Sequence, residues 1–409
     1  MRNTPEIRFK GFSDAWVQRK LGETAPLRGG FAFQSENFCG EGVPVIRISN
    51  ILATGDVGGQ FVFYQEQPKD ENYTLLDKAA LIAMSGATTG KVSILNNPRN
   101  TKFYQNQRVG HFIRSGNTDY GFISALVRSE FFLNRLQSVL VAGAQPNVSS
   151  KEIDELVFGF PARLPEQTAI GNFFHTLDNA ITLLKRKADA LKQLKKAYLQ
   201  QMFPQAGERM PKVRFTGFTG PWRIRKLGEV IERVQGNDGR MDLPTLTISA
   251  ASGWLDQRER FSNNIAGKEQ ENYTLLSKGE LSYNKGNSKL AKYGVVFELK
   301  THEEALVPRV YHSFRATKES NAALLEYMFA TNIPDSELAK LITSGARMDG
   351  LLNIGFEAFA GISMNIPDKD EQDAISSFLR ALDSQIIAQS HKLEQIKHLK
   401  SAYLQRMFV

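Results

Sequence analysis

The sequence predicts an α/β protein of the α+β kind, with two similar globular domains separated by two long antiparallel coiled-coil helices and an internal pseudo-two-fold. Three segments recur in the same order, at offsets of 206, 200 and 205 residues. They are 5–23 with 211–229, 71–76 with 271–276, and 166–203 with 371–408. Identity is 11 of 19 positions in the first, complete in the second (ENYTLL) and 18 of 38 in the third. A period this long gives each copy room for its own core, unlike the short period of a solenoid.

The third repeat has the pattern of a long helix in both copies. Its apolar positions alternate in steps of three and four, and an acidic residue, Glu166 or Glu371, stands in the first turn. One such stripe could be the core helix of a bundle, whereas two matched stripes favour a mutual coiled coil. The stripe positions we assign to these spacer helices are Leu177, Ile181, Leu184, Leu191, Tyr198, Leu382, Ile386, Leu393, Ile396 and Tyr403.

The helices divide the chain. We predict a first domain at 1–160, a long helix at 161–204, a second domain at 205–366 and a second long helix at 367–409. Each domain mixes β-patterned and helical runs, and these runs are 43–51, 81–84, 92–95 and 294–297 for strands and 121–136 and 322–330 for helices.

The lengths of these parts predict the helix direction. A helix of about 38 residues is about 57 Å long and outreaches a domain whose radius of gyration is about 15 Å. Only PQAGERM separates the first helix from the second domain. If that domain begins and ends near one point, the second helix returns antiparallel and relates the domains by an approximate two-fold, a symmetry that dimeric DNA readers share with DNA.

Composition and charge narrow the class of protein. Of 409 residues, 42% are hydrophobic and 23% charged, which excludes disordered and collagen-like chains. Cys39 is the only cysteine, so an internal disulfide is excluded. No apolar run has the length of a membrane span, and we expect a cytoplasmic protein. The excess of 51 Lys and Arg over 43 Asp and Glu, with a pI near 9.3, suits an anionic partner.

Catalytic and metal motifs are missing from the sequence. SGATTGKV at 85–92 resembles a phosphate-binding P-loop, but it lacks one residue between the glycines and a hydroxyl after Lys91. A turn between strands is the better interpretation, and the remaining alternative is nucleotide hydrolysis. We find no dinucleotide fingerprint, no H-E-x-x-H and no paired cysteines. We therefore expect no catalytic residue and no metal ligand in this chain.

Loops rich in amide and basic side chains suggest contact with DNA. Asn and Gln pair with adenine edges, and Arg or Lys with guanine edges, in the major groove. Such loops lie at 47–50, 102–108, 143–147, 284–289 and 344–347, mostly beside regions where the two halves differ. Taken singly, each is also compatible with an ordinary polar loop, and the basic run at 185–187 with a solvated helix face.

Together these motifs resemble the specificity subunits of type I restriction–modification systems. The resemblance covers nearly the whole chain and is carried by the two domain openings (FKGF, Trp16, KLG and FTGF, Trp222, KLG), SGATTG, NQ at 106–107, GAQPNVS at 143–149 and the EQ pairs at 166 and 371. The second half departs from it, with Arg347-Met-Asp in place of Gln-Pro-Asn.

The resemblance implies two target-recognition domains that each read one part of a bipartite double-stranded DNA target, joined by helices that set the spacing. It implies a non-catalytic chain on which two methyltransferase subunits and two restriction and translocase subunits assemble. Those partners would supply S-adenosylmethionine, ATP, magnesium and the catalytic residues for adenine methylation. The alternative is a structural adaptor that binds partners through its coiled coil without reading sequence.

Carried over to this chain, the expected DNA contacts lie in the polar loops of both halves. They are Arg47, Ser49, Ser85, Thr88, Lys91, Asn106, Gln107, Arg108 and Gln145 in the first half, and Asn284, Lys285, Ser288 and Arg347 in the second.

Overall fold

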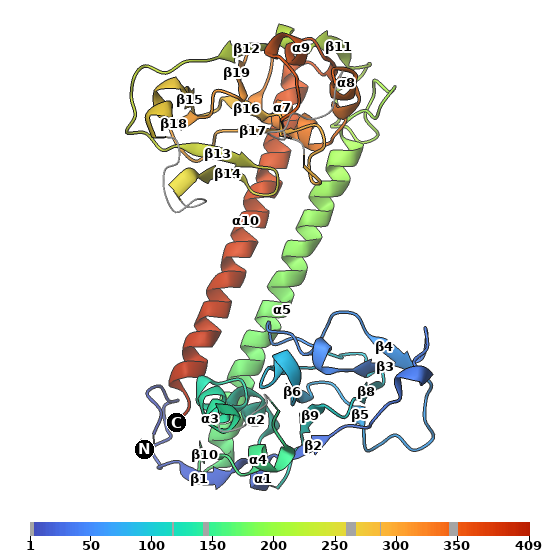
Figure 1. The fold of residues 1–409 in the computed structure, drawn as a ribbon, viewed down its shortest axis with the longest axis vertical. Coiled ribbons are helices and arrows are strands. Elements are labelled where there is room, and N and C mark those ends of the chain that lie inside the picture. Colours follow the sequence, from blue (N-terminus) through green and yellow to red (C-terminus); the bar gives the residue numbers. More distant parts are fainter. Residues whose placement is uncertain (1–3, 117, 142–146, 259–266, 287, 343–350) are drawn as a thin grey trace. The chain divides into compact units, whose positions relative to one another are not determined.

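The computed structural model describes residues 4–116, 118–141, 147–258, 267–286, 288–342 and 351–409 (Figure 1). The chain divides into two compact units. Unit 1 consists of Met1–Arg186 with Ser390–Val409, and unit 2 of Lys187–Gln389. The predicted helical segments enclose the two long helices, α5 (Leu164–Gln201) and α10 (Lys369–Arg406). Each long helix therefore contributes one part to each unit.

Unit 1 is built on three antiparallel or mixed ladders. Strand β1 (Val17–Lys20) pairs antiparallel with β10 (Val157–Phe160). A central antiparallel sheet has the order β2 (Leu27–Gly29), β9 (Val109–Phe112), β6 (Ala80–Ala83) and β7 (Val92–Ile94). A second sheet has the order β4 (Val62–Tyr64), β3 (Val43–Ile46), β8 (Phe103–Gln105) and β5 (Thr74–Leu75), with β3 and β8 parallel. The short helices are α1 (Leu21–Thr24), α2 (Tyr120–Leu126), α3 (Glu130–Val141) and α4 (Ser150–Asp154), with 3-10 turns η1 (Ser35–Asn37), η2 (Ile48–Asn50) and η3 (Gly86–Thr88).

Unit 2 has a corresponding two-stranded ladder and a corresponding central sheet. Strand β11 (Arg223–Lys226) pairs antiparallel with β20 (Ser363–Ile366). The central sheet has the order β12 (Ile231–Val234), β19 (His312–Ala316), β16 (Leu281–Asn284) and β17 (Val295–Glu298). Its outer strands form two separate ladders, β13 (Leu246–Ser249) with β14 (Gly253–Asp256) and β15 (Thr274–Ser277) with β18 (Glu304–Val307). The other elements are η4 (Leu227–Glu229), η5 (Gly267–Asn272), α7 (Ala322–Ala330), α8 (Asp335–Lys340) and α9 (Phe356–Ala360).

The predicted fold class is confirmed, because both units combine a sheet with helices and the central sheets match strand for strand. Two predicted runs are shorter or divided. The run at 43–51 ends as a strand at Ile46, since the next residues form η2. The apolar stretch at 121–136 is two helices, because the Ser129 hydroxyl donates to the Leu126 carbonyl and accepts from the Phe132 amide, which ends α2 and begins α3.

The long helices are antiparallel where they pair within each unit. In unit 1, Phe173 of α5 lies 4.9 Å from Tyr403 of α10 between ring centroids, and Asp178 lies 2.6 Å from Lys400. In unit 2, Tyr198 of α5 lies 4.8 Å from Phe378 of α10. These residues correspond under the 205-residue repeat, so the same contact is made twice with the helices exchanged.

One lysine interrupts the apolar stripe of each long helix, Lys195 in α5 and Lys400 in α10, and each lysine pairs with the other helix. Lys195 of α5 lies 2.5 Å from Asp383 of α10, just as Lys400 of α10 pairs with Asp178 of α5. Each lysine therefore meets a carboxylate of the other helix, and polar positions inside an apolar seam are a known way to fix helix register.

The C-terminal end of each long helix contributes a phenylalanine to a domain core, α10 to unit 1 and α5 to unit 2. Phe408 lies 6.5 Å from Trp16 in the core of unit 1, and Phe203 lies 6.0 Å from Trp222 in the core of unit 2. All four side chains are buried. The repeated ending AYLQ-x-MF is thus a core motif rather than a surface motif.

The EQ pair that begins each helix attaches it to its domain. Both Glu166 oxygens accept from Arg8, at 2.6 and 2.8 Å, and both Glu371 oxygens accept from Arg214, at 2.6 and 2.7 Å. The glutamine that follows each of these glutamates binds the N-cap residue of a short helix in the same unit, which is α2 in unit 1 and α7 in unit 2. Gln167 accepts from the Asp119 amide at 3.1 Å, and Gln372 accepts from the Asn321 amide at 3.0 Å. Bidentate charge-assisted bonds of this kind fix orientation.

Candidate nucleic-acid interface

Three polar loops of unit 1 meet at one edge of its two sheets. They follow β3, β6 and β8 and contain most of the expected DNA contacts. The Asn106 amide donates to the Ile46 carbonyl at 3.1 Å, and the Met84 amide donates to the Arg108 carbonyl at 3.0 Å. The Thr88 hydroxyl donates to the Ile48 carbonyl at 3.4 Å. Residues separated by up to 60 positions in the sequence are therefore joined into one surface.

The predicted side chains of this surface differ in exposure. Ser49, Lys91, Gln107 and Arg108 are exposed, whereas Arg47, Ser85, Thr88 and Asn106 are half-buried. The Arg47 guanidinium lies 5.9 Å from the Phe38 ring, and its buried Nε has no hydrogen-bond partner among the described residues. A half-buried guanidinium with unused donors suits an acceptor supplied by a partner, such as a base edge or a phosphate.

Backbone anchors hold these loops. The buried Asn50 amide donates to the carbonyls of Gly58 and Gln60 at 2.9 and 3.1 Å and accepts from the Arg47 amide at 3.0 Å. Gly30 lies so close to the third loop that a Cβ on it would be 2.3 Å from the Gln105 carbonyl oxygen. Only glycine fits there. Sequence reasoning placed Asn50 in a polar loop but missed its structural role, for which the signal was that side-chain amides often organise turns.

The segment that resembled a P-loop is a turn between antiparallel strands. Residues 86–88 form η3, which connects β6 with β7, and no helix follows. A P-loop needs a strand before it and a helix after it, so that the helix N-terminus faces the phosphates. The interpretation as a strand-linking turn is confirmed, and Lys91 remains an exposed cation beside the other loops.

The predicted contacts of unit 2 lie in the connection from β16 to β17. Asn284 and Lys285 are half-buried and Ser288 is exposed. The Asn284 amide nitrogen donates to the Ile248 carbonyl at 3.2 Å, and Lys285 Nζ donates to the Ile354 carbonyl at 3.2 Å. These bonds tie the connection to β13 and to the segment before α9. Two other predicted contacts, Gln145 and Arg347, lie outside the described residues.

A hollow of about 440 Å³ separates this connection from the β13–β14 turn. On the turn side it is lined by Ser249, Ala250 and Ala251, and on the other side by 286, 288–291 and Val295. Sequence reasoning missed the β13–β14 turn. The signal for it was the Ser-Gly dipeptide at 252–253, a turn former after an alternating strand pattern, and Gly253 has a positive φ of 72°.

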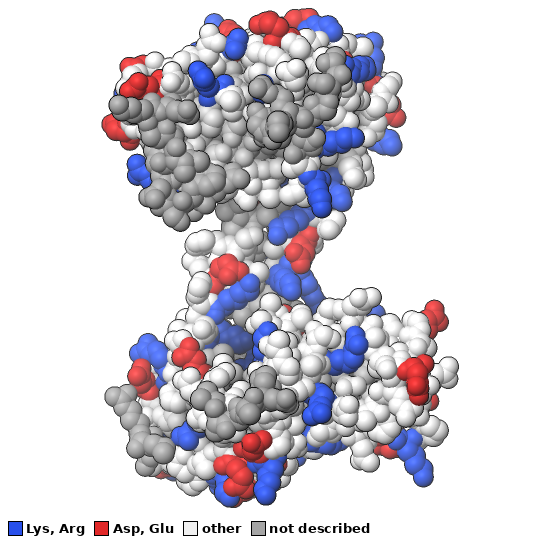
Figure 2. Space-filling view, viewed as in Figure 1, with Lys and Arg blue, Asp and Glu red and all other residues white. Residues whose placement is uncertain are grey.

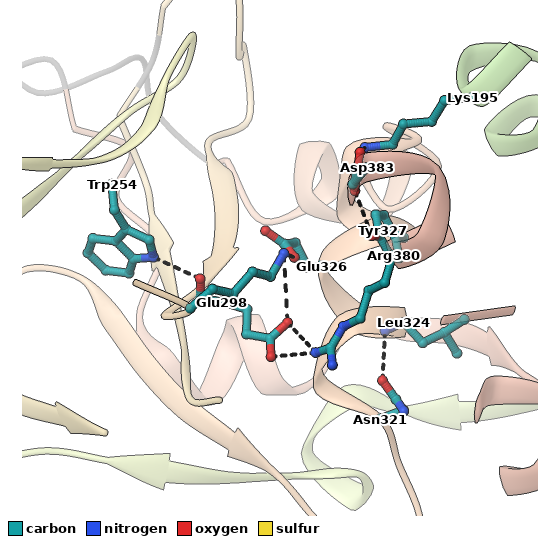
Figure 3. A network of polar contacts seen from close by, with 10 residues as sticks. Lys195, Trp254, Glu298, Asn321, Leu324, Glu326, Tyr327, Arg380 and Asp383 are labelled. Atoms are coloured by element: carbon teal, nitrogen blue, oxygen red, sulfur yellow. Dashed lines mark hydrogen bonds and ion pairs between the residues drawn. The ribbon is translucent and has the colours of Figure 1, made fainter. Parts of the chain in front are cut away.

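A network of charged groups holds β17, the strand that follows this connection (Figure 3). Arg380 of α10 donates to both oxygens of Glu298, at 2.6 and 2.8 Å. Lys300 pairs with Glu326 of α7, and burial raises the pKa of that carboxyl group. Tyr327 donates to Asp383 at 2.7 Å. The connection between β16 and β17 therefore leads into a strand that is bonded to the long helix α10.

The surface charges and the possible metal ligands of the described residues complete the picture of the site. Figure 2 shows Lys and Arg interspersed with Asp and Glu on the visible face. Within the described ranges, no group of three or more His, Cys, Asp or Glu side chains is placed to hold a metal ion. None of the described helices combines the length and apolar character needed to cross a membrane. The spacer positions chosen from the sequence are buried or half-buried in the described helices.

Comparisons with known proteins give one consistent result. Residues 13–193 match the family model described as the type I restriction modification DNA specificity domain. A curated relative, the type I restriction enzyme MjaVIII specificity subunit of Methanocaldococcus jannaschii, is 26% identical over 188 residues, which is 44% of this chain and 44% of the relative. The match therefore spans less than half of that relative's length.

The fold is similar over nearly the full length to a solved structure. The crystal structure of the type I restriction–modification system S subunit from M. genitalium aligns with a TM-score of 0.62 and 13% identity, and the alignment covers 99% of each chain. At this identity the likeness concerns the fold. It includes unit 2, of which the family model covers only 187–193.

Proposed function

We propose that the chain is the specificity subunit of a type I restriction–modification system, since residues 13–193 match the family model of the type I restriction modification DNA specificity domain. In this proposal each unit reads one part of a bipartite double-stranded DNA target, and the chain itself is non-catalytic. The observation that carries the proposal is the second copy of the domain. Unit 2 repeats the strand order of unit 1 in its central sheet and the Glu-Gln attachment of its helix.

The proposed partners supply the chemistry. Two methyltransferase subunits would bring S-adenosylmethionine and methylate adenine, and two restriction and translocase subunits would bring ATP and magnesium, all in the cytoplasm. The support for this assignment is the family of the first domain, the absence of catalytic motifs from the sequence, and the two paired helix segments that such partners could bind.

Sequence-selective binding is the test of this function. A gel shift of the chain with its modification subunits should show tight binding to a minority of genomic duplexes. The logarithm of the association constant should fall linearly with the logarithm of the salt concentration, with a slope of about −0.9 per phosphate neutralised. Comparison of methylated adenines across the genome, with and without the gene, identifies the target. Equal affinity for every duplex and an unchanged methylation pattern would instead favour the structural adaptor.

We further propose that α5 and α10 set the number of unread base pairs between the two half-sites. The support is that both helices are continuous over 38 residues and are fixed at each attachment by a buried carboxylate. Deletion of one heptad from both shortens them by about 10 Å, or about three base pairs. The methylated motif should then have a shorter gap. An unchanged gap would refute this role.

Independent reading by the two units gives a second test. Replacement of residues 1–160 by the first domain of another family member should change one half-site of the methylated motif and leave the other unchanged. The polar loops of unit 1 support this expectation, because their interloop hydrogen bonds are all made within that unit. A change in both half-sites would contradict independent reading.

A further inference from the structure

The connection between β16 and β17 uses its polar side chains to hold itself. The side-chain Oδ1 of Asn284 accepts from the Gly286 amide at 3.0 Å, while its Nδ2 donates to the Ile248 carbonyl. The Ser288 hydroxyl accepts from the Ala291 amide at 3.1 Å. These groups are the ones expected to read bases by hydrogen bonds, and their bonds to the backbone give them a positioning role as well.

What the connection presents to solvent is a leucine and a lysine. Leu290 is 76% exposed, a higher fraction than for any other large apolar side chain in the described ranges, and Lys289 beside it is exposed too. The two form the tip of a turn that is closed by bonds between Ser288 and Ala291, at 3.1 and 3.2 Å. Gly294 closes the base of the turn, since a Cβ there would be 2.5 Å from the Asn284 carbonyl oxygen. The tip is thus a defined projection.

The opposite wall of the hollow, formed by the β13–β14 turn, carries no charged side chain among its lining residues. Ala250 and Ala251 line it, and the nearest polar group there is the Ser249 hydroxyl, which accepts from the Ala251 amide at 3.3 Å. In unit 1 the equivalent connection, between β6 and β7, carries Gly86, Ala87 and Thr88, and its large apolar side chain, Met84, is half-buried against the core. The apolar projection is therefore a property of unit 2.

We infer that Leu290 packs against the C5-methyl group of a thymine in the half-site read by unit 2, with Lys289 next to a phosphate. The inference rests on the proposed function. The thymine methyl is the apolar feature that the major groove offers, and the groove is wide enough to admit a protein projection. Binding would remove from water a leucine that is now held in it, which is favourable, and would make an A·T pair preferred at that position.

Replacement of thymine by uracil removes that methyl group and leaves the base-pair hydrogen bonds unchanged. The complex of the chain with its modification subunits would be titrated with the target duplex in which each thymine is replaced in turn by uracil. We expect about fourfold weaker binding at one position of the unit 2 half-site, which corresponds to about 0.8 kcal/mol for one buried methyl group. Leu290→Ala should bind thymine and uracil duplexes equally, because the partner of the methyl group is gone.

Leu76→Ala is the matched control, since Leu76 is 69% exposed in unit 1. This variant should keep the fourfold difference. The inference is overturned if every uracil is tolerated, if the half-site has no thymine, or if the difference persists in Leu290→Ala. Uracil tolerance together with weaker binding of the modification subunits by Leu290→Ala would identify a protein contact instead. Binding of all duplexes with equal affinity by the unaltered chain would refute the proposed function itself.

Discussion

The two units agree in the parts that attach the long helices and differ in the parts that we assign to DNA reading. Both use a buried glutamate with an arginine, a glutamine that holds a helix cap, and a phenylalanine that packs on a tryptophan. Outside the central sheet, unit 1 has one four-stranded mixed sheet where unit 2 has two separate two-stranded ladders. One scaffold therefore carries unlike outer sheets without a change in how the helices are fixed.

The largest expected effect comes from removal of the phenylalanine that ends each helix. Phe408→Ala should destabilise unit 1 by about 3–5 kcal/mol, although residue 408 lies at the opposite end of the chain from most of that unit. Phe203→Ala should do the same to unit 2. Hydrogen exchange resolved by segment would measure both.

If Phe408→Ala loosened unit 2 as strongly as unit 1, the separate cores described above would be contradicted. A matched control is Leu399→Ala, which alters a half-exposed side chain on the same helix. It should leave exchange in the sheet of unit 1 unchanged within about 0.5 kcal/mol.

The second prediction concerns the buried glutamates. Glu371→Ala leaves Arg214 without its carboxylate, and Glu166→Ala does the same to Arg8, so each should cost about 3 kcal/mol. Equal losses of stability in the two variants would show that the two helix attachments contribute equally. Denaturant midpoints measure the losses. Asp368→Ala is the control, since its pair with Arg223 is exposed and worth little.

Much of the scaffold could be predicted from the sequence, because the repeats mark it. The helix stripes, the Glu-Gln pairs and the endings with Phe203 and Phe408 all stand out when the chain is compared with itself. What a helix end packs against could not be predicted, because a repeat identifies equivalent positions but not their partners. The ion pair between Lys195 and Asp383 could not be predicted either, because it depends on the register of the antiparallel helices.

The loops that we propose to contact DNA could be predicted only as polar segments. Their residue types suggested hydrogen bonds to bases, but a side chain such as Asn284 bonds its own backbone, and composition cannot distinguish the two uses. Leu290 was missed for the opposite reason. An isolated leucine in a sequence is assumed to be buried, and its exposure follows from the turn that places it at a tip.

The third prediction concerns a buried histidine of unit 1. Burial also lowers the pKa of His312 in unit 2, so the test compares variants of His111. Burial first, and then the charge of Arg28, lower the pKa of His111 in unit 1 to about 4. The unfolded chain binds this proton near pH 6.5, so unit 1 has its full stability above that pH and loses up to about 3 kcal/mol as the pH falls to 4. His111→Gln should remove this part of the pH dependence of the denaturant midpoint. A slope equal to that of the unaltered chain would contradict the prediction, and exposed His175→Gln is the control.

The smallest effect tests the exchanged lysines. Asp383 is held by Lys195 and the Tyr327 hydroxyl, whereas Asp178 is held by Lys400 and also by Arg128 at 2.8 Å. Since Arg128 would still neutralise Asp178, Lys400→Ala should cost less than Lys195→Ala, for which we expect about 1 kcal/mol. Double-mutant cycles from denaturant midpoints would measure both couplings. Reversal of the pair, Lys195→Asp with Asp383→Lys, should recover part of the loss, because the attraction depends on opposite charges at these two positions and not on which helix carries the cation. A reversed pair as unstable as the single variants would mean that Tyr327, and not the charge of Lys195, fixes Asp383 in place.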